Sequence, residues 1–90
     1  MNKTIHVLAK HITAGKVRDF RCCPVALALQ DAGYRDAIVM FSRRCPGFVQ
    51  LCGVVAGRVL ELDDVTLYGR IDTFDCGGLM KPFTFTLELP

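Results

Sequence analysis

Hydrophobic and polar residues alternate most regularly at the end of the chain. From Phe83 to Leu89, phenylalanine and leucine occupy every second position, with threonine and glutamate between them. A two-residue period predicts a β-strand with one buried face, here within residues 81–89. A second alternation over residues 4–9 places Ile5, Val7 and Ala9 on one face, and its β-branched residues favour a first strand.

A short apolar helix is predicted over residues 24–32. Pro24 suits the first helical position, because the N–H that proline lacks would have no partner there. Gly33 can adopt the left-handed conformation that closes a helix. A loop around Gly15 is expected to connect the first strand to this helix.

The middle of the chain is predicted to form a hairpin. The apolar run over residues 37–41 has the length of a strand, and residues 43–47 interrupt it with arginine, proline and glycine. The second arm covers residues 48–56. Gly53 and Gly57 indicate a bulge or kink before residues 58–62, which leaves either two short strands or one bent strand.

A second helix is predicted after Leu62. Asp63 or Asp64 can cap it, and Leu67, Ile71 and Phe74 then recur at helical spacing. Glycines at 77 and 78 end the pattern. The polar residues Asp72 and Asp75 are three positions apart, and we interpret them as a solvated helix face rather than as paired catalytic carboxylates.

The predicted elements follow the order β-α-β-β-(β)-α-β in a single domain of residues 1–90. This order predicts an α+β fold, with a mostly antiparallel sheet of four to five strands and two helices on one face. We expect the helices to cover the face that carries Phe83 and Phe85. No linker divides the chain.

Composition then narrows the class of protein. Hydrophobic residues make up 51% of the chain, yet no run approaches the roughly 18 apolar residues of a membrane span. The excess of apolar side chains predicts a homodimer or another partner-binding face. The N-terminus lacks the features of a signal peptide, so we expect a cytoplasmic protein.

Charge and motifs argue against several activities. The net charge of +2 is too small for nonspecific binding of nucleic acid. Phosphate-binding glycine loops and the common hydrolase motifs are missing from the sequence. The five cysteines lack the closely spaced pair of a structural zinc site, and reduced thiols are expected. We therefore predict a non-enzymatic protein without a metal or other cofactor.

The sharpest candidate for a ligand site precedes the first helix. Arg18 and Arg21 lie beside Cys22 and Cys23, just before the N-terminal N–H groups of the helix. Positive charge and a helix N-terminus together favour a phosphate or a partner's carboxylate, and they would also lower the pKa of a thiol. The alternative is a solvated loop before a packing helix.

A second candidate surface lies at the central hairpin. Arg43 and Arg44 are predicted at its tip, with Arg58 alongside, where they could contact an acidic protein surface or nucleic acid. A solubilising turn is the alternative interpretation. Phe48 supplies an apolar anchor for a protein partner.

Four short motifs together resemble a group of small bacteriophage and prophage proteins. They are HITAG at 11–15, CPVALAL at 23–29, IDTFDCG at 71–77 and PFTF at 82–85. The resemblance spans nearly the whole chain and implies a protein that acts stoichiometrically on a host component, with counter-defence as the leading role.

Two modes of action follow from that resemblance. The first is inhibition of a host protein, such as a defence effector, by direct contact. The second is sequestration of a phosphate-bearing signalling nucleotide at the first helix, by Arg18 and Arg21. An accessory nucleic-acid-binding protein is a third possibility, which the low net charge disfavours.

Overall fold

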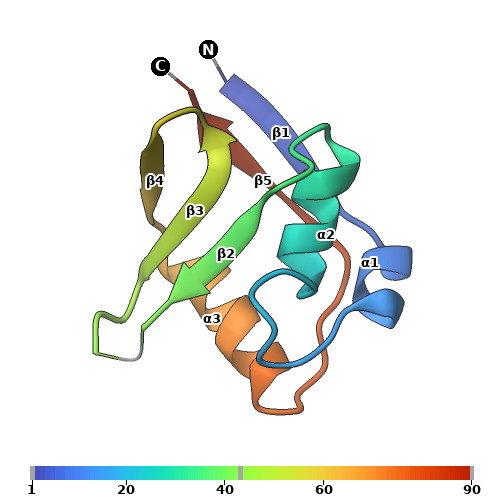
Figure 1. Cartoon of the computed structure of the whole chain (residues 1–90). Helices are drawn as coiled ribbons and strands as arrows, with labels where there is room; N and C mark the ends of the chain where they lie inside the picture. Colours follow the sequence, from blue (N-terminus) through green and yellow to red (C-terminus); the bar gives the residue numbers. More distant parts are fainter. Residues whose placement is uncertain (1, 43, 90) are drawn as a thin grey trace.

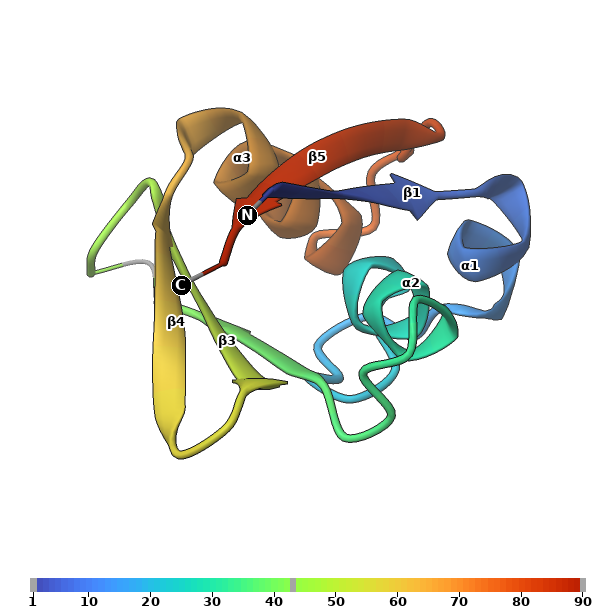
Figure 2. The same ribbon diagram turned by 90° about the horizontal axis from the view of Figure 1, so that it is seen from above.

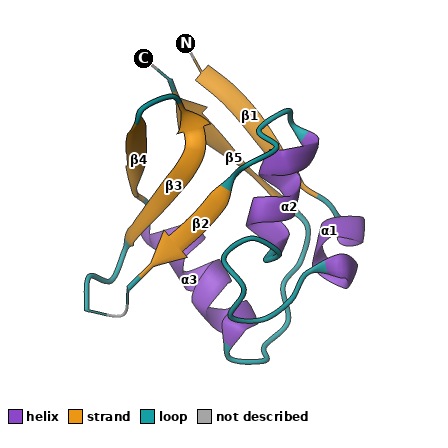
Figure 3. Ribbon diagram, viewed as in Figure 1, coloured by secondary structure: helices purple, strands orange, loops and turns teal. Residues whose placement is uncertain are grey.

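Three helices and two antiparallel sheets form the part of the chain described by the structure, a computed structural model of residues 2–42 and 44–89 (Figures 1 and 3). The elements in chain order are β1 (Asn2–Val7), α1 (Ala9–Ala14), α2 (Pro24–Asp31), β2 (Ile38–Phe41), β3 (Phe48–Val55), β4 (Arg58–Asp63), α3 (Val65–Asp75) and β5 (Phe83–Glu88). The α+β class and the antiparallel pairing are confirmed. None of the described helices has the length and apolarity needed to cross a bilayer.

The strands divide between two sheets instead of the single sheet that the sequence predicts. β1 pairs with β5, and β2, β3 and β4 form a three-stranded sheet in that order. A groove of about 380 Å³ lies between β4 and β5, and its lining includes the carboxylates of Glu61, Asp63 and Glu88. Like charges along two facing strand edges oppose pairing, which favours the separation.

Helix α1 is an element that the hydrophobic pattern does not predict. The first strand ends at Val7, and Ala9 is exposed at the start of α1 instead of lying on the buried face. The Nδ1 atom of the buried His11 accepts a hydrogen bond from the backbone N–H of Leu8 at 2.9 Å. His11, at the third helical position, thus accepts from the N-cap N–H as glutamate or glutamine does in a capping box, while Leu8 at the N-cap has no side-chain acceptor, so the usual sequence signal is missing.

The other two helices begin as predicted. Pro24 occupies the first turn of α2, and Gly33 follows the helix with a positive φ of 108°. At α3, an Asp64 carboxylate oxygen accepts from the backbone N–H of Leu67 at 2.9 Å. The predicted bulge is also present, because the pairing of β3 with β4 shifts between Leu51 and Val55.

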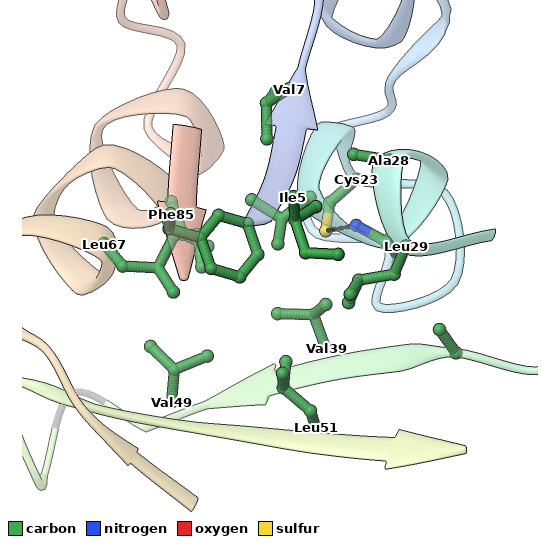
Figure 4. Packing of buried hydrophobic residues seen from close by; sticks show 14 of the residues in the cluster. Ile5, Val7, Cys23, Ala28, Leu29, Val39, Val49, Leu51, Leu67 and Phe85 are labelled. Atoms are coloured by element: carbon green, nitrogen blue, oxygen red, sulfur yellow. Dashed lines mark hydrogen bonds between the residues drawn. The ribbon is translucent and has the colours of Figure 1, made fainter. Parts of the chain in front are cut away.

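The core lies between the three-stranded sheet and the other elements (Figure 2). Val39, Val49 and Leu51 project from the inner face of this sheet toward side chains of β1, β5, α2 and α3 (Figure 4). Phe85 and Leu67 meet on the α3 side of this core. Phe83 is half-buried, with the Arg70 guanidinium of α3 over its ring at 4.5 Å. Helix α3 thus covers the face of β5 that the sequence predicts to be buried.

Candidate functional site

A hollow lined largely by apolar side chains lies beside the end of β2 and the start of β3. We call it the apolar groove; its volume is about 450 Å³, and it is lined by Phe20, Met40, Phe41, Ser42, Cys45, Phe48, Gln50 and Glu61. Phe20 is 47% exposed and Phe48 is 40% exposed. Two half-exposed phenylalanines at one hollow are more than an isolated surface hydrophobe, so the groove is a candidate binding site.

The strand register explains why these side chains gather. Met40 of β2 lies opposite Gln50 of β3, which in turn lies opposite Glu61 of β4. Their neighbours Val39 and Leu51 are buried in the core. Successive side chains of a strand point to opposite faces of a sheet. Because Val39 and Leu51 point into the core, the adjacent side chains of Met40, Gln50 and Glu61 lie on the outer face.

Phe20 reaches the groove from the loop before α2. Its backbone oxygen accepts a hydrogen bond from the N–H of Val39 at 2.9 Å, so the loop lies against the edge of β2. The Asp19 carboxylate accepts from the N–H groups of Arg21 and Cys22 at 3.0 and 3.1 Å. These bonds hold an irregular segment in place and fix the backbone that carries the exposed ring.

A smaller cavity continues from the groove. We call it the side pocket; it has a volume of about 240 Å³, is lined by Arg18, Phe20, Phe41 and Asp75, and shares both phenylalanines with the groove. Asp75 is only 8% exposed, and its Oδ1 atom accepts from the backbone N–H of Arg18 at 3.0 Å. The interpretation of Asp75 as part of a solvated helix face is therefore wrong, because the loop before α2 covers it.

Phe41 is held from behind by α3. Its ring meets Tyr68 edge to face, with the centroids 5.2 Å apart. The Tyr68 hydroxyl donates to the backbone oxygen of Ser42 at 3.1 Å. The wall that separates the groove from the core is thus fixed by packing and by a hydrogen bond.

The N-terminus of α2 is capped by the protein itself. The Cys23 Sγ atom accepts from the N–H of Ala26 at 3.4 Å, and both residues are buried (Figure 4). Burial raises the pKa of the Cys23 thiol to about 11. The expectation of a lowered thiol pKa is therefore wrong for Cys23, because loss of hydration outweighs the helix N–H groups.

The four residues predicted to bind a ligand do not face one common space. Arg18 lines the side pocket, whereas Cys23 belongs to the core. Arg21 is exposed and Cys22 is half-buried. A ligand role for this group remains a prediction, and the contacts at the helix N-terminus do not favour it.

The predicted partner-binding residues separate in space. Phe48 lines the apolar groove, and Arg44 is exposed in the turn between β2 and β3. Arg58 pairs with Val55 at the opposite end of β3 from Phe48, so it does not lie alongside the predicted tip. Arg43 lies outside the described residues.

Sequence reasoning missed Phe20, Met40 and Asp75. The one local signal for the site was Phe20, an aromatic residue between the charged residues Asp19 and Arg21. An aromatic side chain in a charged loop does not belong to a predicted core element, so it is a candidate for an exposed contact residue. The five cysteines, all of which lie in the described part of the chain, form no disulfide. Across residues 2–42 and 44–89, no three histidine, cysteine or acidic side chains gather in a way that could hold a metal ion.

Comparison with known proteins gives no relative. No protein family model, curated protein or solved structure matches the chain.

Proposed function

We propose that this protein is a non-enzymatic binding protein that inhibits a host protein by direct contact through the apolar groove. The exposed pair of Phe20 and Phe48 at a groove beside β2 and β3 carries the proposal. A few anchor residues in well-packed pockets, aromatic residues prominent among them, supply most of the binding energy of protein interfaces. The resemblance to bacteriophage proteins suggests a cytoplasmic target in the host's anti-phage defence.

The composition of the site favours a protein over a phosphate-bearing nucleotide. Glu61 is the charged residue of the apolar groove, and it would repel a phosphate. In the side pocket, the Asp75 carboxylate accompanies Arg18. The N–H of Ala26, which an anion at α2 would need, donates instead to the Cys23 thiol. Apolar walls with few charges suit the centre of a protein interface.

The state of the candidate catalytic groups supports a binding role. With a pKa of about 11, the Cys23 thiol is protonated near neutral pH and is a poor nucleophile. The His11 ring uses Nδ1 to accept from Leu8, and its Nε2 lies 2.7 Å from an Asp31 carboxylate oxygen. Both ring nitrogens therefore have structural partners.

The proposal is tested by capture of host proteins followed by direct binding. Wild-type protein and the Phe48→Ala and Phe20→Ala variants are immobilised, exposed to bacterial host lysate, and the retained proteins are quantified by mass spectrometry. The matched control is Val59→Ala, which truncates an apolar side chain that is 49% exposed on β4. Binding of the purified candidate target is then measured by calorimetry.

We expect the target to bind wild type and Val59→Ala equally, and to bind each phenylalanine variant at least about 10-fold more weakly. Equal binding by all four proteins would rule out the groove as the contact surface. Sedimentation velocity on the same variants tests a second copy of this chain as the occupant. A dimer dissociated by Phe48→Ala would assign the groove to self-association instead.

A further inference from the structure

We propose that the side pocket receives a tryptophan side chain of the partner protein, whose indole N–H donates a hydrogen bond to the Asp75 carboxylate. This inference rests on the proposed contact function and specifies its anchor. It follows from three features of the pocket: an Asp75 carboxylate oxygen that accepts no hydrogen bond from the described residues, the aromatic walls, and the charges of the lining residues.

The Asp75 carboxylate has capacity for a further donor. Oδ1 accepts from the Arg18 N–H at 3.0 Å, and within residues 2–42 and 44–89 no other donor bonds to this side chain. The same residues contain no fully buried side-chain oxygen that lacks a partner. Oδ2 therefore retains accessible surface although Asp75 is only 8% exposed, and Asp75 lines the side pocket. A carboxylate oxygen in such a place favours an N–H or O–H group from a ligand.

The walls of the pocket suit an aromatic ring. Phe20 and Phe41 line it together, and Phe41 is fixed by its edge-to-face contact with Tyr68. The volume of about 240 Å³ is below the roughly 300–1,000 Å³ of pockets for drug-sized ligands. One inserted side chain fits this space, and the adjoining apolar groove takes its neighbours.

Charge distinguishes tryptophan from a lysine or arginine anchor. The residues that line the pocket include one cation, Arg18, and one anion, Asp75, so the lining has no net negative charge to attract a second cation. An indole has a donor and no acceptor, and its face is attracted to a guanidinium. A neutral aromatic donor therefore satisfies Asp75 without opposing Arg18.

The test uses N-acetyl-tryptophanamide as the probe, with ¹H–¹⁵N NMR of the whole protein. The Arg18 N–H, which donates to Asp75, reports on the pocket directly. We expect shifts concentrated at Arg18, Phe20 and Phe41, with a Kd of about 0.1–1 mM, as the size of the probe allows. The analogue methylated at the indole nitrogen should bind at least about 5-fold more weakly, because it leaves the acceptor unpaired.

The Asp75→Asn substitution removes the proposed acceptor Oδ2 and keeps the hydrogen bond from the Arg18 N–H. The amide oxygen can continue to accept from the Arg18 N–H, while an NH₂ group replaces Oδ2 and presents a donor to the probe. We expect this variant to lose at least about 5-fold in probe affinity. The control is Asp36→Asn, which removes one exposed carboxylate outside the pocket and should bind as wild type does. Thermal melts establish that both variants fold.

Three results would overturn the anchor: no probe binding at these residues, equal binding of the methylated probe, or tighter binding of N-acetyl-argininamide. If any of them occurs while Phe48→Ala still weakens binding of the target as expected, the contact function stands without this anchor. If the probe behaves as expected and Phe48→Ala leaves target binding intact, the proposed use of the groove is wrong.

Discussion

The carboxylate of Asp75, the last residue of α3, accepts a hydrogen bond at 3.0 Å from the backbone N–H of Arg18, 57 residues earlier in the chain. Arg18 itself has a φ of 57°, in the left-handed region that residues other than glycine rarely adopt. The bond therefore holds an unfavourable backbone conformation in the loop that carries Phe20. Stability of this loop and shape of the candidate site depend on the same contact.

Two substitutions of Asp75 should separate the effect of the hydrogen bond to Arg18 from the effect of the carboxylate charge. Asp75→Ala removes the acceptor and leaves the Arg18 N–H unpaired, so we expect a loss of about 1–2 kcal/mol in the free energy of unfolding. Asp75→Asn keeps an acceptor and should lose less. Urea unfolding followed by circular dichroism measures both changes. Equal losses for the two variants would indicate that the carboxylate charge, and not the bond to Arg18, is what matters.

The exposed carboxylate of Asp31 should make the protein less stable as the pH falls in the acidic range. Hydrogen bonds from His11 and from Lys10 lower the pKa of Asp31 below its ordinary value of 3.8. A group whose pKa is lower in the folded state stabilises the protein above the unfolded-state pKa, and this contribution disappears as the pH falls through the folded-state value. We therefore expect Asp31→Asn to lower the Tm near pH 7 and to have a diminishing effect below about pH 4. Melting curves from pH 2 to 7 provide the measurement, and a difference that persists undiminished at the acid end would contradict the assignment.

The buried thiol of Cys23 should make the protein less stable as the pH rises in the alkaline range. Because its pKa rises from 9.0 to about 11 on folding, the thiol contributes fully below pH 9.0 and loses that contribution as the pH rises toward 11. Cys23→Ser should remove this dependence and retain a side-chain cap on α2. Denaturant unfolding between pH 8 and 11 compares the two proteins.

Reactivity gives an independent measurement on the same thiol. Under a brief pulse of iodoacetamide at pH 8, the exposed Cys45 and Cys76 should be alkylated while Cys23 stays unmodified until the protein unfolds. Peptide mapping by mass spectrometry identifies the sites. Rapid labelling of Cys23 in the folded protein would contradict its burial.

Substitution of Gly53, in the bulge, should destabilise the protein more than substitution of Gly57, which has the same backbone conformation. Gly53 and Gly57 both have a φ of 79°, but a Cβ at 53 would lie 2.5 Å from the backbone oxygen of Asp36, whereas position 57 is open. We expect Gly57→Ala to cost about 1–2 kcal/mol from backbone conformation alone. Gly53→Ala should cost more, and chemical denaturation of both variants measures the difference. If the two costs are equal, the close approach to Asp36 has no energetic consequence.

Local pattern in the sequence determined most of the elements. The apolar period of two predicted β5, and the combination of Pro24 with Gly33 predicted α2, because each signal depends on neighbours along the chain. The Asp64 cap and the spacing of Leu67 and Ile71 did the same for α3. The α+β class followed from the order of these elements.

Tertiary structure alone decided the sheets and the site. Hydrophobic period does not specify which strand edges pair, so the separation of β4 from β5 depends on contacts between distant residues. The candidate site depends on the same kind of contact, because Phe20 reaches the groove through a bond to Val39 and Asp75 is buried by Arg18. Even the lowered pKa expected for a thiol at this position was reversed for Cys23 by packing, since burial raises its pKa more than the N–H groups of Ala26 and Val25 lower it. The chain thus encodes its helices and strands locally, while the exposed phenylalanines and the carboxylate that form the site come together through long-range packing.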